Sequence, residues 1–253
     1  MIKERHRYRL PAQPLTLWQL LRCSLQLWGA VCSMWLVYLL LYISCLVLLD
    51  VALEAWLPVE AFSPENIPLV VGALLLNLLL LVLINSLFLG AMLLRLQLFA
   101  LGQSCRMLDG LRLALHKLPT LLLAGVLYTI SISFGGVLLL LPGLMLAVSL
   151  SLYGYFVLLQ DAGALEALAA SRALIRGYWW RMLAGYAMPT IVLSASLLLL
   201  PQLQILPAGY WLYAVVQNAL LGLFGSYFIV LGWLQYQDLQ VRKRGCVSKG
   251  RTP

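Results

Sequence analysis

The chain has 253 residues, of which 63% are hydrophobic and only 10% are charged, and its formal net charge is +8. A soluble protein of this length needs charged side chains every few residues along its surface, so this composition excludes a large soluble protein. The positions of the charges are more informative than their number. Four stretches contain no Asp, Glu, Lys or Arg, and they run from Cys23 to Leu49, from Asn66 to Leu94, from Leu118 to Gln160 and from Met182 to Gln237.

Each of these stretches is long enough to cross a lipid bilayer, because a hydrocarbon core of about 30 Å needs about 20 apolar residues per helix. The third and fourth are long enough for two crossings, with breaks expected near Pro142-Gly143 and between Pro201 and Pro207. The sequence therefore predicts an all-α polytopic membrane protein, a single membrane domain over residues 1–253. Its six transmembrane helices are predicted at about 23–49, 67–94, 119–141, 143–160, 182–200 and 209–237.

The basic residues are confined to one set of connections. All 17 Lys and Arg residues fall within positions 3–22, 95–117, 172–181 and 242–251, and these segments alternate with pairs of predicted spans. Because short segments rich in Lys and Arg remain in the cytoplasm, both termini are predicted to be cytoplasmic. The connection between the first two spans carries only acidic charges, at Asp50, Glu54, Glu60 and Glu65.

Two of the basic segments predict amphipathic helices at the membrane surface, near 101–118 and 162–177. In the first, apolar residues recur with helical spacing at positions 107, 108, 111, 114, 115 and 118. In the second, the predicted apolar stripe consists of Leu165, Leu168, Ala169 and Ile175. A weaker pattern of the same kind precedes the first span. The chain is therefore interpreted as three units, each an interfacial helix followed by a two-span hairpin. Either this is a threefold internal repeat, or helices that enter a membrane obliquely share these features without repetition.

Six basic residues on or beside these two helices form the most concentrated candidate site. One interpretation is that they bind anionic lipid headgroups, since each basic residue near an anionic surface contributes about 1 kcal/mol. The other is that the charges only fix the orientation of the spans. The six residues are Arg106, Arg112, Lys117, Arg172, Arg176 and Arg181.

Polar side chains are few inside the predicted spans, and four amides there form a second candidate site. Under one interpretation they line an uncharged intramembrane cavity. Under the other they support helix packing, because Asn and Gln hydrogen-bond across helix contacts. The four residues are Asn77, Asn85, Gln217 and Asn218.

Two local predictions follow from proline and glycine. Leu140 to Gly143 reads Leu-Leu-Pro-Gly, which favours a type II turn between the third and fourth spans. Pro189 is expected to kink the fifth span.

The sequence offers little support for catalysis or for ion transport. No Asp, Glu, Lys, Arg or His lies in the middle of a predicted span, which weakens ion- and proton-coupled transport. Short catalytic, phosphate-binding and metal-binding motifs are missing, so we predict no catalytic residue, no cofactor and no metal site. The basic residues adjoin span ends, where membrane topology requires them, so nucleic acid is not predicted as a partner.

One region resembles a known family. Residues 141–161 read LPGLMLAVSLSLYGYFVLLQD, and residues 167–174 read ALAASRAL. They resemble the YciC-like family of bacterial inner-membrane proteins and, more distantly, the membrane domain attached to some glycerophosphoryl diester phosphodiesterases. The resemblance covers about residues 95–190. It implies a six-helix protein of a bacterial inner membrane with a link to envelope homeostasis, and it supplies no catalytic residue.

These patterns predict a non-enzymatic integral membrane protein that acts through membrane lipids or a membrane-protein partner in envelope organisation. The alternative is a passive transporter or lipid-handling protein with an uncharged intramembrane cavity. A through-membrane polar pocket that touches Asn77, Asn85 and Asn218 would favour the alternative, whereas a filled bundle would favour the first function.

Overall fold

A computed structural model of the chain describes residues 14–56, 66–103, 107–138, 140–201 and 209–249, and every regular element within these ranges is helical. The α-helices are α1 (Leu17–Trp56), α2 (Ile67–Ala100), α3 (Met107–Leu138), α4 (Leu140–Leu150), α5 (Tyr153–Gln160), α6 (Ala164–Ile175), α7 (Trp179–Leu199) and α8 (Gly209–Lys249).

Six of the described segments are long and apolar enough to cross a membrane. Each overlaps one of the six predicted spans, so the prediction of an all-α polytopic membrane protein is confirmed. The six segments are Leu17–Leu53, Ile67–Ala100, Leu108–Gly136, Leu141–Gln160, Trp179–Leu199 and Leu212–Arg244.

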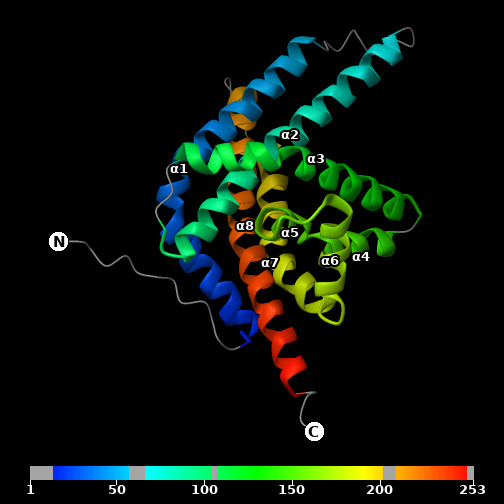
Figure 1. Cartoon of the computed structure of the whole chain (residues 1–253). Coiled ribbons are helices and arrows are strands. Elements are labelled where there is room, and N and C mark those ends of the chain that lie inside the picture. Colours follow the sequence, from blue (N-terminus) through cyan, green and yellow to red (C-terminus); the bar gives the residue numbers. More distant parts are fainter. Residues whose placement is uncertain (1–13, 57–65, 104–106, 139, 202–208, 250–253) are drawn as a thin grey trace, which may run out of the picture.

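The helices form a bundle around α8, and its two ends differ. Helix α1 packs along α8, and α3 packs against both α2 and α4. Figure 1 shows the start of α1 and the end of α8 together at the bottom of the view, and the tips of α1 and α2 together at the top. We call the end with the start of α1 and the end of α8 the basic end, and the other the opposite end.

The core lies in the half of the bundle nearer the basic end. Here the side chains of α8 from Ser226 to Gln235 are almost all buried, and Trp233 contacts no solvent. Trp35 and Tyr38 of α1 are equally buried against them. At the opposite end, the tips of α1 and α2 extend away from the other helices (Figure 1), and among the described residues a small buried cluster around Val70 joins them.

The first predicted amphipathic helix is part of a longer element. Helix α3 begins at Met107 and continues through Pro119 into the third span, so residues 107–118 are helical as predicted but are not a separate interfacial helix. The physical reason is that part of its apolar stripe packs against α2, although Leu108 and Leu115 of that stripe are exposed. Ala114 is completely buried, and it lies with Leu121 against Gly90. The missing N–H of Pro119 removes one hydrogen bond, which this packing offsets.

The predicted turn at Leu140 to Gly143 is also wrong, because these residues are helical in α4. Pro142 therefore falls in the first helical turn, where its missing N–H has no intrahelical acceptor to lose. A Cβ on Gly143 would lie 2.8 Å from the Cα of Gly136, so the two helices touch backbone to backbone here.

The fourth span is broken in its middle, which the sequence analysis did not predict. Helix α4 ends at Leu150 and α5 begins at Tyr153. The buried hydroxyl of Ser171, in α6, accepts a hydrogen bond from the backbone N–H of Leu152 (3.2 Å) and donates one to the carbonyl of Ser149 (3.0 Å). Helix α6 thus satisfies backbone groups that the break leaves without a helical partner.

Helix α6 is the second predicted amphipathic helix, and it is a separate element, but its buried face differs from the predicted stripe. Leu165 is 72% exposed and Ala169 is exposed as well. Leu168 and Ile175 of the predicted stripe are buried, but the contact with the neighbouring helices also uses small residues that the prediction left out. The buried residues are Ala164, Ala167, Leu168, Ser171, Leu174 and Ile175.

Candidate functional site

The six basic residues predicted to bind headgroups do not form one surface. Arg106 lies outside the described residues. Arg112, Arg172 and Arg176 are exposed, and no described acidic residue forms an ion pair with them. The other two, Lys117 and Arg181, are engaged inside the protein.

Lys117 ties α3 to the end of α5. Its ammonium lies 2.5 Å from a carboxylate oxygen of Asp161 and donates a hydrogen bond to the carbonyl of Leu158 (2.8 Å). A cation is favourable at a helix C-terminus, where the last carbonyls lack helical partners. This contact gives Lys117 a structural role in the described part of the molecule.

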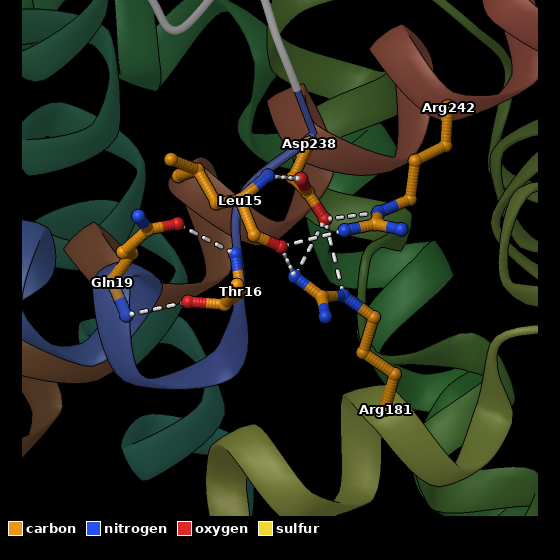
Figure 2. Close-up of polar contacts among 6 residues, drawn as sticks. All are labelled: Leu15, Thr16, Gln19, Arg181, Asp238 and Arg242. Atoms are coloured by element: carbon orange, nitrogen blue, oxygen red, sulfur yellow. Dashed lines mark hydrogen bonds and ion pairs between the residues drawn. The ribbon is translucent and has the colours of Figure 1, made fainter.

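Arg181 belongs to a buried charged cluster at the basic end. Asp238, in α8, is 1% exposed, and its Oδ2 accepts hydrogen bonds from the Nε atoms of Arg181 (3.1 Å) and Arg242 (2.8 Å). Its Oδ1 accepts one from the backbone N–H of Leu15 (2.8 Å). Both arginines also donate to the carbonyl of Leu15, as Figure 2 shows. We call these four residues the Asp238 cluster.

The Asp238 cluster joins the segment before α1 to α7 and α8. Removing a carboxylate from water costs several kcal/mol, and full pairing with two guanidinium groups and one N–H offsets that cost. This cluster was not predicted from the sequence. The four-residue spacing of Asp238 and Arg242 is a readable signal, since such residues are neighbours on a helix. The roles of Arg181 and of the Leu15 backbone depend on tertiary structure.

The four predicted amides are not brought together. Asn85 accepts a hydrogen bond from the hydroxyl of Tyr42 (2.7 Å), which joins α1 to α2. Asn218 donates to the carboxylate of Asp50 (2.8 Å), which joins α1 to α8. Asn77 and Gln217 are half-buried and make no hydrogen bond with a described residue.

A cleft of about 810 Å³ opens among α2, α3, α4, α5, α7 and α8. It lies beside the break in the fourth span, where Ser151 and Gly154 line it. Of the four predicted amides only Asn85 reaches this cleft, and no Asp, Glu, Lys, Arg or His is among its described lining residues. The cleft is therefore uncharged, but it is not the cavity lined by four amides that one interpretation of the sequence proposed.

Most of the polar side chains that line the cleft carry hydroxyl groups. Several donate to backbone carbonyls: Tyr128 to Ala147 (3.3 Å), Thr129 to Gly125 (2.9 Å), Ser151 to Val148 (2.9 Å), Tyr155 to Ile229 (2.9 Å) and Thr190 to Tyr186 (2.7 Å). Ser86 and Tyr153 also line the cleft and donate to no described residue. The cleft thus offers hydroxyl oxygens with free lone pairs and two hydroxyl groups free to donate.

Such a site can bind a molecule with an apolar body and one neutral polar group. The tyrosine rings of Tyr128 and Tyr153, with centroids 5.1 Å apart, form one wall beside mostly apolar side chains. Within the described residues no group of three His, Cys, Asp or Glu side chains is placed to hold a metal ion. No family model, curated protein or solved structure matches the chain.

Proposed function

We propose that this chain is a non-enzymatic protein of a bacterial inner membrane that acts by binding a neutral lipid. The observation that carries the proposal is the uncharged cleft of about 810 Å³. Ligand pockets typically enclose about 300 to 1,000 Å³ and combine apolar walls with a few polar groups that orient the ligand. The cleft meets both criteria, and its position among membrane spans gives lipids direct access to it.

The electrostatics of the cleft select a neutral ligand. An anionic headgroup would lose its hydration there without gaining a cation among the described lining residues, and this costs several kcal/mol per ion. A hydroxyl, ester or amide group loses less and can pair with Ser86, Tyr153 and the hydroxyl oxygens described above. A glyceride with one free hydroxyl is the simplest membrane lipid of this kind.

The orientation is part of the proposal. Short segments rich in Lys and Arg stay in the cytoplasm, so the basic end faces the cytoplasm and both termini lie there. The resemblance to the YciC-like family supports a bacterial inner membrane. The exposed Arg112, Arg172 and Arg176 then face the inner leaflet, where they are available to anionic headgroups or to a membrane-protein partner.

The decisive experiment fills the cleft and measures lipid binding. A Cβ on Gly154 has no neighbour within 4 Å, so a Gly154→Leu side chain extends into the cleft without a clash at its base. We expect Gly154→Leu to weaken binding of a fluorescent diacylglycerol to the purified chain at least tenfold. Gly72→Leu is the matched control, because Gly72 is equally open but lies on the exposed start of α2. Equal binding by the two variants would contradict the proposal.

Two further substitutions test the polar contacts. Ser86→Ala and Tyr153→Phe should each weaken binding about three- to tenfold, the usual range for one net hydrogen bond. Ser133→Ala and Tyr213→Phe are suitable controls, because neither residue lines the cleft. If all four variants bind equally, the hydroxyl groups do not orient the ligand.

Passive transport is a second candidate, and the broken fourth span favours it. Transporters often build substrate sites from discontinuous helices, and the cleft adjoins the break between α4 and α5. Flux of a neutral amphiphile across proteoliposomes containing the chain would distinguish transport from binding alone. Transport predicts flux that Gly154→Leu abolishes, whereas binding alone predicts none above the rate of empty liposomes.

A further inference from the structure

A second hollow, separate from the cleft, runs between α1, α7 and α8. This groove has a volume of about 680 Å³ and shares no lining residue with the cleft. It uses other faces of α7 and α8, where Val192 and Leu223 line it. Val192 is 50% exposed and Met188, another lining residue, is 54% exposed, so the groove opens toward the surrounding lipid.

The polar atoms in the walls of the groove are already paired within the protein. The indole N–H of Trp28 donates to the hydroxyl of Ser226 (2.9 Å). The hydroxyl of Tyr227 is 2.8 Å from that of Ser24. The rings of Trp28 and Tyr227 meet edge to face, with centroids 6.4 Å apart. The interior of the groove therefore presents apolar surface, which suits a hydrocarbon chain.

One end of the groove carries the only charge among its described lining residues. Arg22 is exposed there and forms no ion pair with a described residue. Trp18 precedes it by one helical turn, so the two side chains lie on the same face of α1. Trp18 is 70% exposed, and both residues lie within the first two turns of α1, at the basic end. Together they present a guanidinium group and an indole N–H to a ligand.

This combination fits a phosphate group above an acyl chain. Guanidinium groups bind phosphate oxygens through charge-assisted hydrogen bonds, and Trp and Arg residues are favoured at the membrane interface. From Arg22 the groove continues past Leu25 to Trp28, about 9 Å further along α1 at 1.5 Å per residue. We propose that the groove holds one acyl chain of an anionic phospholipid, whose phosphate is bound by Arg22 and Trp18.

The test measures binding of phosphatidylglycerol to the purified full-length chain by native mass spectrometry. Arg22→Gln should weaken binding about fivefold, the contribution of one basic residue near an anionic surface. Arg172→Gln is the matched control, because Arg172 is exposed and does not line the groove. Equal binding by these two variants would overturn the assignment of the phosphate to Arg22.

Blocking the groove tests whether it holds the acyl chain. Val192→Trp should weaken phosphatidylglycerol binding at least tenfold, whereas Leu198→Trp should not. Leu198 is on the same helix, is 79% exposed and lies outside the groove. Unchanged binding by Val192→Trp would overturn the proposal that the groove holds the acyl chain. Equally tight binding of oleate, which lacks a phosphate, would overturn a phospholipid as the occupant.

The phospholipid site in the groove does not depend on the function proposed for the cleft, and the same variants distinguish the two sites. Gly154→Leu should keep phosphatidylglycerol binding, and Val192→Trp should keep diacylglycerol binding. Loss of both ligands in either variant would mean that the two sites are not distinct.

Discussion

At the basic end, the segment before α1 is joined to α7 and α8 by the buried carboxylate of Asp238 and the two arginines that pair with it. At the opposite end, α1 and α8 are joined by the hydrogen bond between Asn218 and the exposed Asp50. The tips of α1 and α2 carry many exposed leucines there, and they extend away from the remaining helices (Figure 1). The two ends of one bundle thus differ in how their helices are held together.

The difference shows what determines helix association in a membrane. Lipid tails are as apolar as leucine, so burying a leucine between helices brings little gain over leaving it in lipid. Polar contacts and close backbone packing must then decide which helices meet. Near the basic end polar contacts are available, because the guanidinium and carboxylate groups of the Asp238 cluster lie there. The following predictions test this comparison.

The largest effect is expected at the Asp238 cluster. Asp238→Ala leaves Arg181 and Arg242 facing each other without their carboxylate, and breaking a buried ion pair in this way costs about 3 to 5 kcal/mol. The free energy of unfolding in detergent micelles should fall by that amount. Asp109→Asn is the control, because Asp109 is exposed in the first turn of α3. If the two variants are equally stable, the cluster does not hold the basic end together.

The next effect concerns backbone contact between α3 and α4. A Cβ on Gly143 would meet backbone atoms of Gly136, which cannot move aside, whereas a Cβ on Gly136 has no neighbour within 4 Å. Gly143→Ala should therefore lower the unfolding free energy by up to about 3 kcal/mol, as overpacking does. Gly136→Ala should be neutral or stabilising, since Ala favours helix. Equal effects of the two substitutions in a thermal unfolding assay would show that this contact does not matter.

The six spans were predictable because lipid imposes a simple requirement, about 20 apolar residues without charge for each crossing. The break between α4 and α5 was not predictable, because Ser151 and Leu152 are ordinary helix residues and their partner Ser171 comes from a separate helix. The turn was expected at Pro142-Gly143, but both residues are also compatible with the start of a helix.

The candidate sites were predicted less well than the spans, for a related reason. Charge-free stretches and basic clusters are local features, whereas ion pairs join distant positions. Lys117 and Arg181 were predicted beside span ends, but their partners are Asp161 and Asp238, which no local pattern connects to them. Likewise, residues from six helices line the cleft, its polar side chains are mainly hydroxyl groups, and only Asn85 among the predicted amides reaches it.

A smaller effect is expected where α6 covers the break. Ser171→Ala removes the hydroxyl that binds the N–H of Leu152 and the carbonyl of Ser149, and it leaves both groups buried without that partner. The unfolding free energy should fall by about 1 to 2 kcal/mol. Hydrogen exchange at Leu152 should accelerate in the variant. Ser196→Ala is the control, since the hydroxyl of Ser196 makes an exposed hydrogen bond to a carbonyl of its own helix. Unchanged exchange at Leu152 would argue against this capping role.

The smallest effect is expected at the opposite end. Asn218→Ala removes the hydrogen bond to Asp50, and interhelical hydrogen bonds of membrane proteins contribute about 0.6 kcal/mol on average. Asp50 is exposed, so its carboxylate regains water when the amide is lost, unlike the two arginines that Asp238→Ala strands. Comparing the two variants in the same unfolding assay therefore measures the contrast between the ends directly. If Asn218→Ala destabilises the chain as much as Asp238→Ala does, the opposite end is held as firmly as the basic end, and burial of the charges is not what distinguishes them.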